Sequence, residues 1–84
     1  MGYGKDYHTV HDLDEFDAVK LRFYEVLGSK DFFALANFLE TTPAQLSDAR
    51  RRLRIPVQWF RIIFLKTKVN PHWLLTGTGE KELL

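Results

Sequence analysis

The sequence predicts a small all-α domain of four to five short helices packed around one core. Apolar residues recur at helical spacing along most of the 84 residues. Thr42-Pro43 and Asn70-Pro71 each place a capping residue before a proline, the order that starts helices. No segment shows the apolar-polar alternation of a strand. The apolar share of 45%, with seven Phe and two Trp, is enough for one compact core.

The first half of the chain predicts an arm and two helices. Residues 1–12 show no period and contain two Gly, so we expect a flexible N-terminal arm before a single domain at 13–84. A helix follows from Leu13, with acidic residues at its start, and Gly28 ends it. Ser29 then caps a second helix, which reaches about Leu39 and is followed by a short break.

The second half predicts three further helical segments. Thr42, Pro43 and Gln45 form a capping box, in which Gln45 returns a hydrogen bond to the cap, and this third helix runs to about Arg52. Pro56 starts a fourth helix, whose aromatic residues and those of the last segment we expect in the core: Trp59, Phe60, Phe64 and Trp73. Asn70-Pro71 opens the short last segment, and Gly77 ends it.

The second and third helices are joined by only about three residues, a connection that suits a helix-turn-helix corner. Residues 29–53 are therefore predicted to form this unit. In such a motif the second helix enters the major groove of DNA, and its N-terminal residues reach the base edges.

The order of several short motifs along the chain is similar to that of a known family. These motifs are Leu35-Ala36, Leu39, Thr42, Leu46-Ser47, Arg52, Ile55-Pro56 and the ending Val69-Asn70-Pro71-His72-Trp73-Leu74-Leu75-Thr76-Gly77. Over residues 16–80 the chain resembles the N-terminal DNA-binding domain of bacteriophage repressors of the CI type. The resemblance implies a compact lambda-repressor-like helix-turn-helix fold and a transcriptional repressor that binds double-stranded operator DNA as a homodimer.

The resemblance also implies positions for the DNA contacts. The recognition helix would begin at Thr42, with base-reading positions at Pro43, Ala44 and Asp48 and with Ser47 and Arg51 nearby. Phosphate contacts would fall near residues 29–32 and on Asn37.

The chain departs from the family pattern at three places. Glu40 stands in the turn where the family commonly has Gly. Phe32 and Phe33 open the second helix where polar groups would meet a phosphate. Pro43 and Ala44 replace amide side chains, and they can touch a thymine methyl but cannot form a bidentate bond to a base.

Charge is distributed unevenly along the chain. Residues 1–41 hold four basic against eight acidic side chains, and residues 42–84 hold eight basic against three acidic, so an anionic partner would bind the second half. Helical spacing places Arg51 on one face with Ala44, Ser47 and Asp48.

Arg50, Arg52 and Arg54 would contact phosphates or pair with acids of the first helix, and Lys66 or Lys68 could add contacts to the DNA backbone. The complete predicted DNA-binding set is Asn37, Thr42, Pro43, Ala44, Gln45, Ser47, Asp48, Arg50, Arg51, Arg52 and Arg54. The alternative for the arginines is a solvated helix end.

Other classes of site find little support in the sequence. There is no Cys, and the spacing of His8 and His11 has no matching second pair, so we expect no metal site and no cofactor. No order of residues indicates catalysis or a small-molecule substrate, so we expect no enzyme. No apolar run approaches the ~20 residues of a membrane span, and with no signal sequence evident we expect a cytoplasmic protein.

Two alternatives stay open at this point. A protein-interaction module could keep the repressor fold without reading DNA, using Phe32, Phe33 and Phe38 as an apolar patch. The family's full repressors carry a second, oligomerising domain, and this sequence either lacks it or is a fragment of a longer chain.

Overall fold

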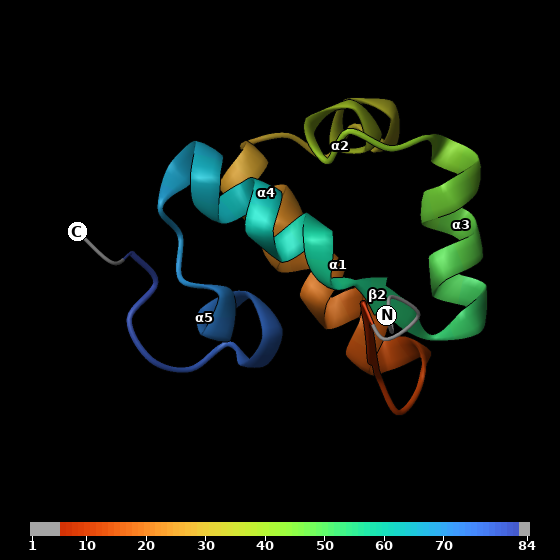
Figure 1. Ribbon diagram of the computed structural model, residues 1–84, viewed down its shortest axis with the longest axis horizontal. Helices are drawn as coiled ribbons and strands as arrows, with labels where there is room; N and C mark the ends of the chain where they lie inside the picture. Colours follow the sequence, from red (N-terminus) through yellow and green to blue (C-terminus); the bar gives the residue numbers. More distant parts are fainter. Residues whose placement is uncertain (1–5, 83–84) are drawn as a thin grey trace.

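Five helices and one two-stranded sheet make up the part of the chain that the computed structural model describes, residues 6–82 (Figure 1). The elements in chain order are β1 (Tyr7–Thr9), α1 (Leu13–Leu27), α2 (Phe32–Phe38), α3 (Pro43–Arg52), β2 (Arg54–Pro56), α4 (Val57–Thr67) and α5 (Pro71–Thr76). The predicted compact domain of four to five short helices is confirmed. None of the helices in this range is both long and apolar enough to cross a bilayer.

Helix α1 begins and ends at the residues that its sequence predicts. The carboxylate of Asp12 accepts a hydrogen bond from the Glu15 backbone N–H at 2.9 Å, which satisfies a donor at the helix start. Gly28 adopts φ 80° at the other end and donates its N–H to the Tyr24 carbonyl at 2.8 Å. Because glycine has no Cβ, it enters this left-handed conformation without strain.

The core lies where α1, α2, α3 and α4 meet, and α5 closes it on one side. Leu35, Leu39 and Ile63 are fully buried, and Phe23 packs edge-on against Phe60 with ring centroids 5.6 Å apart. Of the aromatic residues expected in the core, Trp59 and Phe60 are buried, whereas Phe64 and Trp73 are only partly buried.

Helix α5 is fixed to α1 through its carboxyl end. Asn70 accepts a hydrogen bond from His72 N–H at 3.0 Å, as expected of the cap before Pro71. At the far end the Arg22 guanidinium of α1 donates to the Leu74 and Leu75 carbonyls at 3.0 and 3.2 Å. These carbonyls have no partner within the helix, so Arg22 serves as its C-terminal cap.

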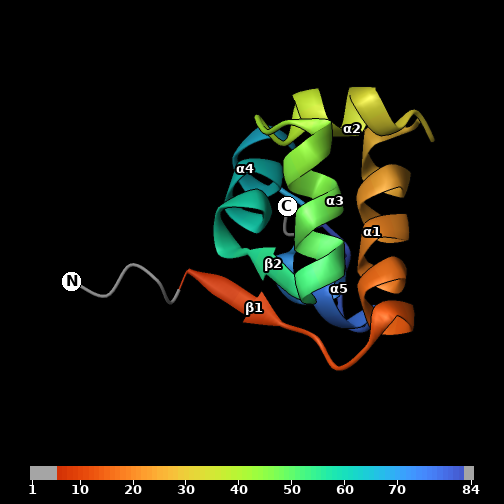
Figure 2. The same ribbon diagram turned by 90° about the vertical axis from the view of Figure 1, so that its right-hand side faces the viewer.

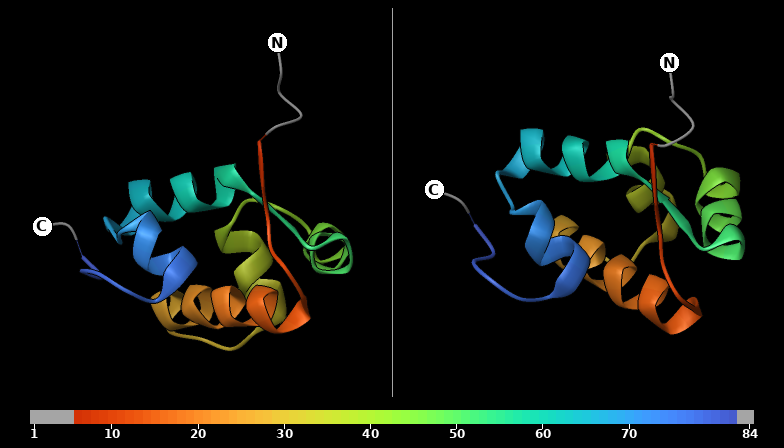
Figure 3. Two further views of the ribbon diagram at one scale, coloured as in Figure 1. Left: turned by 90° about the horizontal axis from the view of Figure 1, so that it is seen from below. Right: turned by 60° about the horizontal axis from the view of Figure 1, so that its bottom comes forward.

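The small sheet differs from the sequence-based expectation of a loose arm without strands. Tyr7, His8 and Thr9 pair antiparallel with Pro56, Ile55 and Arg54, and Val10 is buried. Figure 3 shows the N-terminal strand passing beside the segment between α3 and α4. Three-residue strands are too short for an alternating pattern, and their backbone partners lie far along the chain, so no local signal marks them. Residues 1–5 of the expected arm and residues 83–84 of the expected domain lie outside the described residues, and the division at residue 12 stays a prediction.

The arrangement leaves α3 at an edge of the molecule. In Figure 2, α3 and α1 run side by side and α2 crosses one end of the pair, while the strands lie at the other end. The outer side of α3 therefore faces the viewer in Figure 2, on the side opposite α5 and the C-terminal segment in Figure 1.

Candidate nucleic-acid interface

Helix α3 buries one side and exposes the other. Leu46 and Ala49 point into the core with 2% and 7% of their surface exposed. Ala44, Ser47 and Arg51 are exposed on the outer face. This division follows the 3.6-residue period of the helix, so the face predicted from spacing is the one that solvent reaches.

The corner between α2 and α3 depends on a strained residue. Glu40 adopts φ 58°, a left-handed conformation that most residues avoid, and donates its N–H to the Asn37 carbonyl at 3.1 Å. Thr41 donates its N–H to the Ala36 carbonyl at 2.9 Å. The chain thus completes the turn without glycine, at a local energetic cost.

The cap of α3 is only half of the predicted capping box. The Thr42 hydroxyl accepts a hydrogen bond from Gln45 N–H at 3.1 Å, as expected. The Gln45 side chain does not return a bond to Thr42, because its carboxamide oxygen accepts from the Thr41 hydroxyl instead. The Gln45 side chain therefore adds a hydrogen bond to the turn instead of bonding the backbone N–H of Thr42.

The start of α2 also differs from the prediction. Asp31, not Ser29, is the cap: its carboxylate accepts from the N–H groups of Phe33 and Ala34 at 2.9 and 3.3 Å. Ser29 instead accepts from Asp31 N–H at 3.1 Å. A side-chain carboxylate thus occupies the helix end that would otherwise attract a phosphate.

Arg50 anchors α3 to α1. Its guanidinium donates to both carboxylate oxygens of Asp17, at 2.8 and 3.0 Å. These hydrogen bonds lower the pKa of Asp17 below its ordinary value, so the carboxylate stays charged at neutral pH. Pairing with an acid of the first helix was one of the two roles predicted for this arginine.

Asp48 binds the next two arginines along the same helix. Arg52 Nε lies 2.9 Å from one carboxylate oxygen, and Arg51 donates to the other. Hydrogen bonds from Arg52 and Arg51 lower the pKa of Asp48. The outer face of α3 therefore carries one carboxylate between two guanidinium groups.

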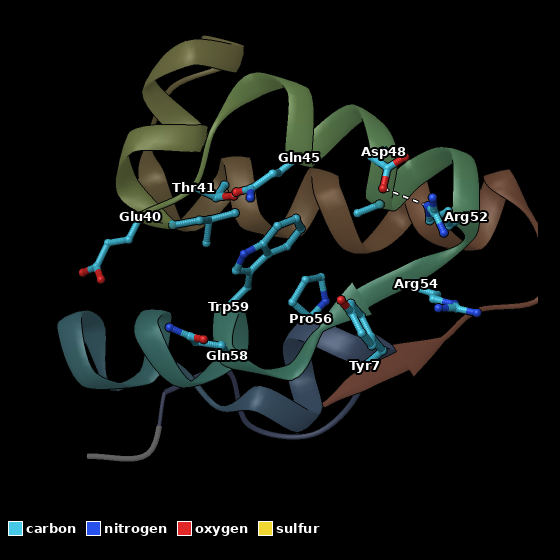
Figure 4. A pocket seen from close by; sticks show the side chains of 12 residues that line it. Tyr7, Glu40, Thr41, Gln45, Asp48, Arg52, Arg54, Pro56, Gln58 and Trp59 are labelled. Atoms are coloured by element: carbon cyan, nitrogen blue, oxygen red, sulfur yellow. Dashed lines mark hydrogen bonds and ion pairs between the residues drawn. The ribbon is translucent and has the colours of Figure 1, made fainter. Parts of the chain in front are cut away.

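Arg54 follows α3 on β2 and contacts an aromatic ring. Its guanidinium carbon lies 5.7 Å from the centre of the Tyr7 ring on β1. Within residues 6–82 no carboxylate lies within ion-pair distance of Arg54. Both side chains line a hollow of about 340 Å³ between α3, the strands and the start of α4 (Figure 4).

A model of one protein family matches most of the chain. The model of the bacteriophage CI repressor helix-turn-helix domain matches residues 18–82, which hold α2, α3 and most of the core. The chain belongs to this family. No curated protein and no solved structure matches.

Membership of the CI repressor family confirms the predicted resemblance and the fold class. The family is one of repressor DNA-binding domains and not a class of enzymes. Its match begins at Ala18, so residues 6–12 and their strand lie outside it.

Most of the remaining predicted residues of this CI-type domain lie near the turn between α2 and α3. Asn37 and Thr42 are exposed on either side of the turn, and Pro43 is partly exposed. Lys66 donates to the Phe38 carbonyl at 2.7 Å and lies 3.6 Å from Glu40, so it stabilises the corner. Lys68 lies over the Phe64 ring, at the far end of α4.

The apolar patch of the alternative hypothesis is smaller than expected. Phe33 is 71% exposed, but Phe32 and Phe38 pack against the core. A single exposed ring is common on protein surfaces and indicates no particular interface.

Sequence reasoning missed two features of this surface. The contact between Tyr7 and Arg54 had no local signal, because it depends on the pairing of β1 with β2. The Asp48 pairs could have been found, since Arg51 and Arg52 follow it at the i+3 and i+4 positions that meet on a helix.

Proposed function

We propose that the chain is a sequence-specific DNA-binding regulator of transcription, with α3 lying in the major groove of operator DNA. One observation carries the proposal: in a CI repressor domain, α3 presents Ala44, Ser47 and Arg51 on its exposed outer face at the edge of the molecule. An α-helix fits the width of the major groove, and side chains on its outer face reach base edges.

The chemistry of this face favours a mixture of contacts. Arg51 can form a bidentate pair with guanine, and Ser47 can bond to any base. Pro43 and Ala44 supply apolar contact to a thymine methyl, and Asp48 can accept from cytosine N4.

Phosphate contacts on both sides of the groove would position α3. We assign them to Asn37 on α2, to Thr42 and Gln45 at the start of α3, and to Arg52 and Arg54 at its end. Arg50 remains partly exposed beside Asp17, so it contributes positive potential while it holds α3 against α1.

A single α3 can read only one half-site. We propose that the functional unit is a homodimer in the cytoplasm, whose two recognition helices lie about 34 Å apart on successive turns of the duplex. Sedimentation with and without a palindromic duplex would test the stoichiometry, and one protomer per duplex at saturation would contradict it.

The experiment that tests base reading compares Arg51→Ala with the wild type on duplexes selected from a random library. Each single-base-pair variant of the selected duplex is titrated against both proteins. If Arg51 binds a guanine, the wild type discriminates at that base pair by about 1–3 kcal/mol and Arg51→Ala loses this discrimination. Identical profiles for the two proteins would remove Arg51 from the groove.

A further inference from the structure

Backbone hydrogen bonds join the segment before α1 to the segment that follows α3. Beyond the strand pairing, Val10 donates its N–H to the Leu53 carbonyl at 3.0 Å, and Val57 donates its N–H to the Asp6 carbonyl at 2.9 Å. The buried Val10 side chain adds an apolar anchor. The two strands therefore form a ribbon, residues 6–10 with 53–57, that follows directly from the end of α3.

The register of this ribbon brings Tyr7 and Arg54 to the same face. Thr9 lies directly opposite Arg54, and Tyr7 lies opposite Pro56. Tyr7 is thus the diagonal neighbour of Arg54 across the strands, a separation that an aromatic side chain can span. Ile55, between them, is buried on the other face.

Arg54 differs from the three arginines before it. Arg50 is bonded to Asp17, and Arg51 and Arg52 are bonded to Asp48. An aromatic ring attracts the guanidinium but does not neutralise its charge, whereas a carboxylate does. Arg54 therefore keeps its full charge for an external anion.

The hollow beside α3 leaves room for that anion. It opens between Arg52 on α3 and Arg54 on β2, with the Tyr7 ring on the ribbon side (Figure 4). Gln45 from the first turn of α3 and Gln58 from the start of α4 add hydrogen-bonding groups to its lining. Two carboxylates also line the hollow, but Asp48 is paired with Arg52 and Glu40 with Lys66. The Arg54 guanidinium at the other end therefore remains available for a phosphodiester.

We propose that this ribbon is a second DNA-contacting element, in which Arg54 binds one backbone phosphate and Tyr7 is the positioning residue that holds Arg54 toward it. The inference rests on the proposed function, since it assumes that α3 lies on DNA. It assigns a part in DNA binding to the segment before α1. The family match begins at Ala18 and does not include this segment.

The test measures binding of a mixed-sequence duplex by fluorescence anisotropy over a range of salt concentrations. The variants are Arg54→Ala, Tyr7→Ala, Tyr7→Phe and the Tyr7→Ala/Arg54→Ala pair. Loss of one phosphate contact reduces the slope of log K against the logarithm of the salt concentration by about 1. This change corresponds to about tenfold weaker binding near 0.1 M salt. We expect this for Arg54→Ala, a smaller loss for Tyr7→Ala and wild-type binding for Tyr7→Phe, which keeps the ring.

The double variant separates positioning from a general loss of structure. If Tyr7 acts through Arg54, removing both side chains is no worse than removing Arg54 alone. Additive losses would overturn the positioning role, because they would mean that Tyr7 acts by another route. Circular dichroism melting of each variant shows whether the fold is kept.

Lys81→Ala is the matched control for the loss of one positive charge. Lys81 pairs with Glu25 at 2.8 Å and belongs to the C-terminal segment, which lies away from α3 in Figure 1. We expect wild-type affinity for this variant. An equal loss for Lys81→Ala and Arg54→Ala would overturn the inference, since net charge alone would then explain the result.

DNA binding by the domain and phosphate binding by the ribbon can be tested separately. If the wild type binds no duplex at low salt, both the proposed function and this inference are wrong. If the wild type binds and weakens with salt while Arg54→Ala or Tyr7→Ala behaves like the wild type, the function stands and the ribbon proposal is wrong.

Discussion

Arg50 of α3 and Asp17 of α1 form a two-point contact, with Nε and Nη2 at 2.8 and 3.0 Å from the two carboxylate oxygens. The pair joins α3 to α1, the longest helix among the described residues. Both guanidinium nitrogens of this contact are bonded to Asp17, although the Arg50 side chain stays partly exposed. The orientation of α3 therefore depends on a polar contact in addition to the burial of Leu46 and Ala49.

This contact predicts a pH dependence of stability. Because the pKa of Asp17 is lower in the folded state than its ordinary value of about 3.9, the pair stabilises the fold above that value. The stabilisation is lost as pH falls through the lowered pKa. In urea unfolding at pH 7, Asp17→Asn should lower the free energy of unfolding by less than Leu46→Ala, which should cost about 2–5 kcal/mol. The wild-type and Asp17→Asn values should converge as pH falls below the lowered pKa of Asp17, and a constant gap would contradict the assignment.

Glu40→Gly should stabilise the domain. Glu40 holds φ 58° in the turn, and a left-handed residue with a Cβ costs about 1–2 kcal/mol relative to its relaxed state. Glycine removes most of that strain, but it loses more conformational entropy on folding than glutamate does. The free energy of unfolding should therefore rise by up to about 1 kcal/mol. Glu40→Ala loses the same contact with Lys66 but keeps the strain, and it should give no gain. A gain of equal size in both variants would show that the charge, not φ, is responsible.

Gly77 and Gly28 form a second matched pair. Both adopt positive φ at the end of a helix, so alanine at either position should cost about 1 kcal/mol. A Cβ on Gly77 would also lie 2.7 Å from Arg22 Nη2, whereas a Cβ on Gly28 meets nothing within 4 Å. Gly77→Ala must displace the guanidinium that caps α5, so thermal unfolding should show the larger loss for Gly77→Ala. Equal losses would mean that the Arg22 cap contributes nothing.

Asp48→Asn should increase binding to DNA of mixed sequence. The charged carboxylate holds Arg51 and Arg52 and repels nearby phosphates, so its neutral replacement frees two cations. We expect about threefold to tenfold tighter binding in anisotropy titrations at low salt, with a steeper salt dependence. Glu80→Gln, a charge change in the C-terminal segment, should have no effect. Weaker binding by Asp48→Asn would indicate that the carboxylate itself contacts a base.

The sequence predicted the elements whose signals are local. Thr42-Pro43 and Asn70-Pro71 lie at helix starts, and Gly28 and Gly77 lie at helix ends, because caps and stops depend on residues within one turn. The outer face of α3 followed from helical spacing in the same way. These features need no knowledge of distant contacts.

The strands and the Tyr7–Arg54 contact, which the sequence did not predict, depend on distant pairing, whereas the missed Asp31 cap is local. The strands β1 and β2 have no pattern of their own, and their pairing joins segments that lie far apart in the sequence. The cap of α2 shifted from Ser29 to Asp31 because a carboxylate two residues later binds two N–H groups at once. The contact between Tyr7 and Arg54 follows from the strand register, so it cannot be predicted until that register is known.

The most direct test of the central claim is a salt titration of the wild-type chain with a mixed-sequence duplex. If α3 and its flanking residues bind the major groove, binding is measurable at low salt, and log K falls linearly with log salt at about −0.9 for each phosphate contacted. A chain that binds no duplex at low salt, or whose affinity does not change as salt rises, would contradict the account.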